Sequence, residues 1–123
     1  MIALKMKTKI ATDREQSLWL VKHGLNIQTA DMFWEWDGER DNLWPGTEWA
    51  APEVVTPSWS LTALLKLMPV RTRQGRFSMI RTGNHITEFR YGHGFNMKAY
   101  GAKEPVDAAV LMVAWLLKHQ YIT

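Results

Sequence analysis

The segment from residue 108 to 117 consists of ten consecutive apolar residues, Ala-Ala-Val-Leu-Met-Val-Ala-Trp-Leu-Leu. A helix on the surface of a globular protein has one apolar stripe and one polar face, whereas this segment is apolar all round. It is about half as long as the ~20 residues that a helix needs to cross a bilayer. We therefore predict a core helix that begins at Pro105 and is covered on more than one side, either by the rest of the chain or by a second copy of it.

Two further helices are predicted from their end signals. Thr12 and Glu15 form a capping-box pattern before a helix that Gly24 ends. Its buried side is expected to carry Leu18, Val21 and Leu25, with Trp19 beside them. A second helix over 61–68 is expected to be capped by Ser58 or Ser60 and ended by Pro69, after a loop over 47–57.

Alternation of apolar and polar residues predicts an antiparallel sheet. Three such segments, separated by glycine-containing turns, indicate a meander near 76–100: 76–82, 85–91 and 95–100. Phe89 and Tyr91 are expected to face the core, together with Phe95, Met97 and Ala99, while Lys98 and Tyr100 face outward. Segment 32–36 alternates as well, and Asp37-Gly38 after it predicts a two-residue hairpin turn. The chain is thus predicted to be a single α+β domain over 1–123, with three helices packed on an antiparallel sheet of three to five strands. Residues 1–10 are expected to form a loose arm or an edge strand.

The charges are divided unevenly along the chain. Residues 31–53 hold seven acidic residues and one basic residue, whereas 66–103 hold eight basic residues and one acidic residue. The two surfaces neutralise each other within the fold, or the basic one binds an anionic partner, or copies associate head to tail. A basic sheet with interleaved aromatic residues is one way to bind single-stranded nucleic acid. The candidate anion-binding residues are Arg76, Arg81, Arg90, Lys98 and Tyr100.

Seven tryptophans are unusual in a chain of 123 residues. Trp19, Trp59 and Trp115 stand in helical apolar patterns and are expected in the core. The other four flank the acidic segment and either complete the core or form an interaction surface. These candidate surface residues are Trp34, Trp36, Trp44 and Trp49.

Little in the chain indicates chemistry. There is no cysteine, which favours a reducing compartment such as the cytoplasm. His85 and His93 are expected to be surface histidines at turns; if they met on the meander near Glu88, a metal site there would still lack a third or fourth ligand. The pattern Gly-x-Ser-x-Gly and the phosphate-binding glycine motifs are missing. We therefore predict no catalytic residue, no cofactor and no metal, and hence no enzymatic activity.

The order of several local motifs resembles a family of short uncharacterised proteins from Bacteroidetes genomes and their prophages and conjugative elements. The resemblance spans about 12–122 and is carried by three groups of residues. They are Gln16 with His23-Gly24-Leu25, Thr29-Ala30-Asp31-Met32 and Trp34; Pro57-Ser58-Trp59-Ser60-Leu61 with Leu64-Leu65 and Met68-Pro69; and Pro105-Val106-Asp107-Ala108-Ala109 with Trp115-Leu116-Leu117 and Tyr121-Ile122. Glu104 departs from the Ser, Thr or Asp expected before Pro105. The resemblance implies a cytoplasmic accessory protein of a phage or mobile element, and no family active site can be carried over.

The function predicted from the sequence is therefore a non-catalytic accessory module that acts by protein–protein contact. Its expected partner is another protein or a second copy of the chain, as a homodimer, and no contact with a membrane is expected. The alternative is a nucleic-acid-binding protein that uses the basic segment 66–103.

Overall fold

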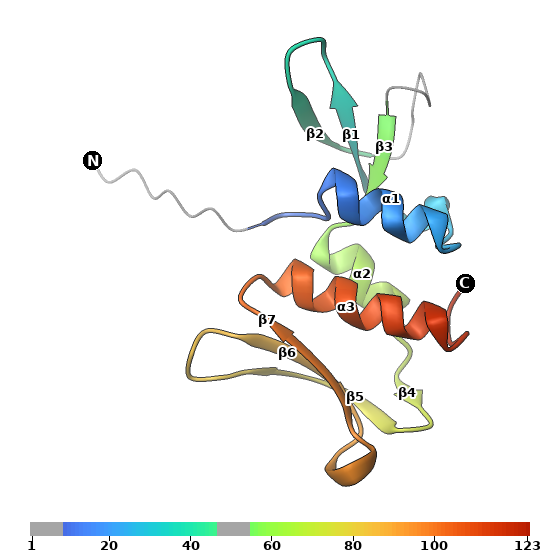
Figure 1. The fold of residues 1–123 in the computed structure, drawn as a ribbon, viewed down its shortest axis with the longest axis vertical. Coiled ribbons are helices and arrows are strands. Elements are labelled where there is room, and N and C mark those ends of the chain that lie inside the picture. The colour runs from blue at the N-terminus through green and yellow to red at the C-terminus, as the bar shows by residue number, and fades with distance from the viewer. Residues whose placement is uncertain (1–8, 47–54) are drawn as a thin grey trace.

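The computed structural model describes residues 9–46 and 55–123, and Figure 1 shows their arrangement. Helices α1 (Arg14–Lys22), α2 (Leu61–Leu67) and α3 (Pro105–Lys118) lie between two antiparallel sheets. One sheet has the order β2-β1-β3, from β1 (Met32–Trp36), β2 (Asp41–Pro45) and β3 (Val55–Ser58). The other has the order β4-β5-β6-β7, from β4 (Arg71–Thr72), β5 (Gly75–Arg81), β6 (Thr87–Tyr91) and β7 (Lys98–Ala102). The predicted α+β class, with three helices and a meander, is confirmed.

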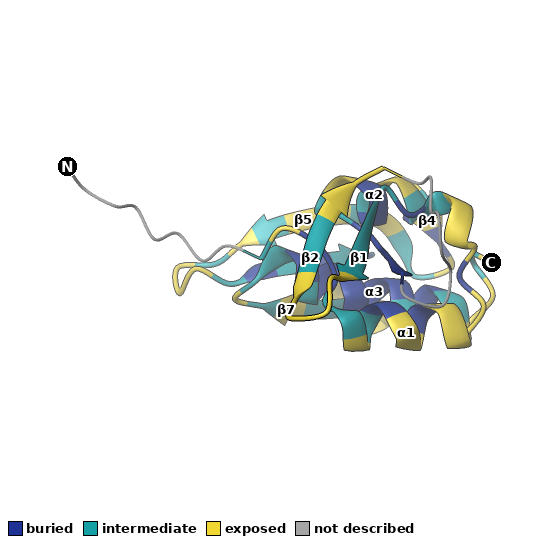
Figure 2. Ribbon diagram, turned by 90° about the horizontal axis from the view of Figure 1, so that it is seen from above, coloured by how far each residue is buried: buried dark blue, intermediate teal, exposed yellow. Residues whose placement is uncertain are grey.

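The apolar helix α3 is the centre of this arrangement. It packs on β6 and β7 with one side and on α2 with another, so this chain itself covers most of it. Eight of its residues are buried: Val106, Ala108, Ala109, Val110, Met112, Val113, Trp115 and Leu116. In Figure 2 the colours show a largely buried α3 beside an α1 with exposed outer turns. One strip of α3 remains accessible, because Leu111 is 45% exposed and Lys118 is exposed.

The start of α1 differs from the prediction by one residue. Asp13 is the N-cap and Gln16 completes the capping box with it, so the assignment to Thr12 and Glu15 was wrong. Thr12 is instead fully buried, and its hydroxyl accepts a hydrogen bond from the Trp59 amide. A hydroxyl that takes part in core packing is not free to cap a helix.

The buried face of α1 was also predicted wrongly. Ser17 and Leu20 point into the core, while Leu18 and Trp19 are exposed. Apolar character alone placed Leu18 and Trp19 inside, but residues three apart share one face of a helix, and the fold packs the face of Ser17 and Leu20 on the core. The predicted end is confirmed, because Gly24 has φ +94° and the Leu25 amide donates back to the Leu20 carbonyl.

The three-stranded sheet was only partly predicted. β1 has the expected bounds, but its connection to β2 spans four residues, 37–40, in place of a two-residue turn. Asp37 accounts for the longer loop, because its carboxylate accepts hydrogen bonds from the Glu39 and Arg40 amides. Within the predicted loop 47–57, residues 47–54 lie outside the described part, and β3 begins at Val55. The expected cap of α2 is confirmed at Ser60.

In the meander, the facing of the last strand was predicted wrongly. Phe89 and Tyr91 are fully buried as expected. However, β7 begins only at Lys98, after a 3-10 turn over Gly94–Asn96 that leaves Phe95 fully exposed. Tyr100 pairs with Phe89 in the sheet and packs against the core. Because side chains alternate along a strand, the loop length after β6 decides which set faces the helices.

Candidate binding groove

Of the four tryptophans predicted as an interaction surface, the three that the structure describes do not share one face. Trp34 pairs with Leu43, and Phe33 pairs with Trp44, so Trp34 and Trp44 lie on opposite faces of the three-stranded sheet. The Trp34 indole donates a hydrogen bond of 2.8 Å to the Thr12 carbonyl and so has a structural role. Trp36 and Trp44 are about half exposed, at 50% and 48%. Trp49 lies outside the described residues.

The five candidate anion-binding residues also divide between two faces. Arg76 and Arg90 lie on the face of the meander that points away from the helices, and Arg90 forms an ion pair of 2.7 Å with Glu88. The other three share the face of Phe89 and Tyr91: Arg81, Lys98 and Tyr100. Of these, Lys98 and Tyr100 meet, with the Lys98 Nζ 5.0 Å from the centre of the Tyr100 ring.

Lys98 and Tyr100 form one wall of a groove that no sequence motif predicts. It lies between α1, α3 and β7 and has a volume of about 590 Å3. Its lining is mostly aromatic and aliphatic, with basic groups among them: Trp19, His23, Lys98, Tyr100, Leu111, Ala114, Trp115, Leu117, Lys118 and His119. Pockets of this size, with an apolar lining and few polar groups, are typical of binding sites.

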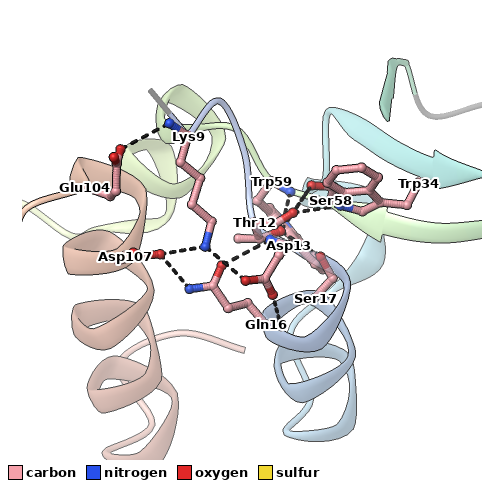
Figure 3. A network of polar contacts seen from close by, with 10 residues as sticks. All are labelled: Lys9, Thr12, Asp13, Gln16, Ser17, Trp34, Ser58, Trp59, Glu104 and Asp107. Atoms are coloured by element: carbon pink, nitrogen blue, oxygen red, sulfur yellow. Dashed lines mark hydrogen bonds and ion pairs between the residues drawn. The ribbon is translucent and has the colours of Figure 1, made fainter. Parts of the chain in front are cut away.

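The groove exists because α1 and α3 run side by side in the same direction (Figure 1). Their first turns are joined by a polar network, which Figure 3 shows. The Gln16 side-chain amide donates to the Asp107 carboxylate over 2.8 Å, and the Lys9 Nζ donates to the same oxygen over 2.7 Å. Lys9 also binds the Asp13 carboxylate over 3.0 Å. The groove begins one helical turn after this network, where Trp19 of α1 and Leu111 of α3 line the space between the helices.

The charges of this network stabilise one another. Burial by itself would lower the pKa of Lys9, but hydrogen bonds to Asp107 and Asp13 raise it above the ordinary value. Burial would likewise raise the pKa of Asp107, whereas the hydrogen bonds from Lys9 and Gln16 hold it below the ordinary value. Lys9 and Asp107 therefore both stay charged over the neutral range, and their ion pair holds the helix starts together.

The floor and the α1 side of the groove are aromatic. The Trp19 ring stacks on the His23 ring, with centroids 3.8 Å apart. Trp115 packs between Tyr91 and Tyr121 and is itself buried. Trp19, at 41% exposure, and Leu111 present the accessible apolar surface. Trp19 was expected in the core because it stands in a helical apolar pattern, and its exposure shows that this prediction was wrong.

The groove is electrostatically one-sided. Four basic or titratable nitrogen-bearing side chains line it (His23, Lys98, Lys118 and His119), and no acidic residue among those described does so. The acidic residues of β1, β2 and the turn between them lie in the other sheet, on the far side of the helices (Figure 1). A groove with an apolar floor and a positive rim favours a ligand that combines apolar surface with negative charge.

The residues examined for chemistry are engaged in the fold or lie far apart. His85 precedes β6 and His93 follows it, so the five residues of that strand, about 16 Å, lie between them and the two do not meet. Asp31 accepts hydrogen bonds from the Ser60 amide, over 2.8 Å, and from the Ser60 hydroxyl. Within residues 9–46 and 55–123, no three His, Asp or Glu side chains come close enough to hold a metal ion.

Comparison with family models, curated proteins and solved structures finds no match to this chain. The resemblance to a mobile-element family therefore stays a prediction. In the part of the chain that the structure describes, no helix combines the length and apolar content needed to cross a bilayer.

Proposed function

We propose that this protein is a non-catalytic binding module. Its groove binds a segment of a protein that carries both acidic and apolar side chains. The observation that carries the proposal is the combination of exposed Trp19 and Leu111 with the basic rim of Lys98 and Lys118. Exposed aromatic residues in a concave site are the usual energetic centres of protein interfaces. The lysines select for negative charge and raise the rate of encounter.

The chemistry of the groove supports binding rather than catalysis. A catalytic histidine is usually oriented by a carboxylate that binds one of its ring nitrogens. Here the His23 Nδ1 lies 2.8 Å from the backbone carbonyl of Trp19 in its own helix. Among the described lining residues there is no hydroxyl nucleophile other than the Tyr100 phenol. These groups can hold a ligand by contact and charge.

A protein segment fits this site better than a nucleic acid does. Nucleic-acid binding depends on a continuous track of cations that follows the phosphates. Arg76 and Arg90 face away from Lys98 and Tyr100, so the residues expected to form such a track lie on two sides of a sheet.

The proposal is tested with a short helical peptide that has leucine and tryptophan on one face and glutamate on the other. A second peptide with lysine in place of glutamate is the matched probe. In NMR titrations of the labelled protein, we expect the acidic peptide to shift the indole N–H resonance of Trp19 and the methyl resonances of Leu111. The lysine peptide should bind at least about tenfold more weakly, since it repels Lys98 and Lys118.

Two variants locate the binding. Leu111→Glu places a negative charge on the floor of the groove, and we expect it to weaken binding of the acidic peptide by at least about tenfold. Met79→Glu is the matched control, because Met79 is 56% exposed on β5 and does not line the groove. Equal effects of the two variants, or shifts confined to other surfaces, would contradict the proposal. Binding of a single-stranded oligonucleotide that blocks the peptide would favour the nucleic-acid alternative instead.

A further inference from the structure

The acidic hairpin formed by β1 and β2 carries the chemistry that the groove selects. We infer that the tip of this hairpin, Trp36 to Asp41, inserts into the groove of a second copy, so that copies associate head to tail. This inference rests on the proposed function of the groove and names its occupant. It is drawn from the apolar surface, charge and position of the two sites.

The hairpin tip combines a half-exposed tryptophan with carboxylates. Trp36 is the last residue of β1 and pairs with Asp41, the first residue of β2. The loop between them places Asp37 and Glu39 at the end of the hairpin. The segment 31–46 contains five acidic residues and one basic residue. An aromatic anchor flanked by acidic groups complements an apolar floor flanked by lysines.

The tip is built as a rigid structure. The Asp37 carboxylate accepts hydrogen bonds from the amides of Glu39 and Arg40 and from the Asn42 side chain. Asp41 is held by Arg14 over 2.7 Å. A preorganised loop loses less conformational entropy when it is bound than a disordered segment does.

The hairpin cannot reach the groove of its own chain in this fold. Its turn stands at the end of the molecule that points away from the helices, while the groove lies between α1, α3 and β7 (Figure 1). Contact between the two sites therefore requires a second copy. Because they are different surfaces, the contact is heterologous and leaves one free hairpin and one free groove at the ends of each assembly.

The charges also argue against a symmetric dimer in which one groove faces another. Such a contact would bring Lys98 and Lys118 of the two copies together, and juxtaposed like charges are unfavourable. Docking of the hairpin in the groove brings Asp37 and Glu39 towards these lysines instead. The apolar contact would join Trp36 of one copy to Trp19 and Leu111 of the next.

The test is sedimentation of the full chain with two complementary variants. We expect the wild-type protein to increase in average mass with concentration, and less so at high salt, because salt screens the charge contribution. Trp36→Ser removes the anchor and Leu111→Glu blocks the groove, so each variant alone should dissociate at least about tenfold more readily. An equimolar mixture should form dimers and nothing larger, since one variant supplies an intact groove and the other an intact hairpin.

Matched controls separate this contact from a general loss of apolar surface. Trp44→Ser changes an equally exposed tryptophan on the opposite face of the sheet, and Met79→Glu changes an exposed apolar residue outside the groove. Both should associate like the wild type, and circular dichroism should show that all four variants are folded.

Three outcomes would overturn the inference. The first is a wild-type protein that stays monomeric at about 1 mM. The second is continued association of Trp36→Ser, and the third is failure of the mixture to form dimers. If the acidic peptide still binds at Leu111 in any of these cases, the groove keeps its proposed function and only its occupant is wrong. If the peptide does not bind either, both proposals fail.

Discussion

Gln16 and Asp107 are 91 residues apart in the chain and are joined by a hydrogen bond of 2.8 Å. Gln16 also accepts a hydrogen bond from the Asp13 amide and so completes the capping box of α1. One side chain therefore helps both to begin α1 and to place it beside α3. Because both helices run on from this contact in the same direction, it helps to place α1 and α3 as two walls of the groove.

The network around Asp107 makes stability depend on acid pH. The pKa of Asp107 lies below its ordinary value in the folded state, so its contribution is present above the unfolded pKa and is lost as pH falls through the folded pKa. We expect part of the free energy of unfolding to be lost between about pH 5 and pH 2. Asp107→Asn should flatten this part of the curve, as measured by urea unfolding across that range. An unchanged pH dependence in Asp107→Asn would contradict the assignment.

Lys9 contributes from the other side of the same ion pair. Its pKa is raised in the fold, so its contribution is present below the unfolded pKa and is lost as pH rises through the folded pKa, in the alkaline range. Lys9→Met should lower the free energy of unfolding at neutral pH by about 1 kcal/mol. Lys103→Met, at an exposed lysine, is the control and should change it little. Equal effects of the two substitutions would show that the network adds nothing to stability.

Gly92 is required by a close contact between two segments of backbone. It has φ +80°, and a Cβ at this position would lie 1.8 Å from the Gln74 carbonyl oxygen. Gly92→Ala should therefore cost about 3 kcal/mol or more, measured by thermal or urea unfolding. Gly83→Ala is the matched control, since nothing lies within 4 Å of its Cβ position. It should be neutral or slightly stabilising, and a Gly92→Ala protein as stable as Gly83→Ala would contradict the contact.

Thr12 joins α1 to the end of β3 and the residue after it through its buried hydroxyl. It lies 2.7 Å from the Ser17 hydroxyl and 3.1 Å from the Ser58 hydroxyl, and it accepts from the Trp59 amide over 3.1 Å. Thr12→Val keeps the shape but leaves these groups without their partner, so we expect a loss of about 2 kcal/mol in the free energy of unfolding. Thr62→Val, at an exposed position of α2, should change it by less than about 0.5 kcal/mol. A loss of similar size in both variants would exclude the hydroxyl as its cause.

The buried Trp59 should contribute more to the free energy of unfolding than the half-exposed Trp44. Trp59 is fully buried and its indole donates to the Thr29 hydroxyl over 2.9 Å, whereas Trp44 is half exposed. Trp59→Phe should lower the free energy of unfolding by about 2 kcal/mol, through the cavity and the lost hydrogen bond. Trp44→Phe should change it by less than about 0.5 kcal/mol. Urea unfolding of the two variants side by side distinguishes these expectations, and equal losses would contradict them.

Local signals were sufficient for several elements. The continuous apolar run specified α3, since only a helix surrounded by other parts of the protein can bury all of its faces. Gly24 and Ser60 specified the end of α1 and the start of α2 through their backbone and capping preferences. Alternation predicted the strands β1 and β6, and in β6 the alternating apolar residues Phe89 and Tyr91 are buried against the helices.

Other elements depended on contacts that no local pattern contains. β3 was not predicted, because Thr56, Pro57 and Ser58 show no strand pattern. They form a strand because they pair with β1. The facing of Tyr100 depended on the length of the loop before β7, which places it opposite Phe89. Trp19 could not be placed from its apolar character, because the fold packs the face of Ser17 and Leu20 on the core and leaves Trp19 at its edge.

The amino-acid sequence by itself determined the fold class, the apolar helix at its centre and the separation of acidic from basic segments, because each depends on residues close together in the chain. The tertiary structure alone decided that Trp19, Leu111 and Lys98 meet in one groove. These residues come from three elements far apart in sequence, and their meeting depends on the parallel placement of α1 and α3. That placement is set by contacts between residues far apart in the chain, so no local spacing of residues predicts it.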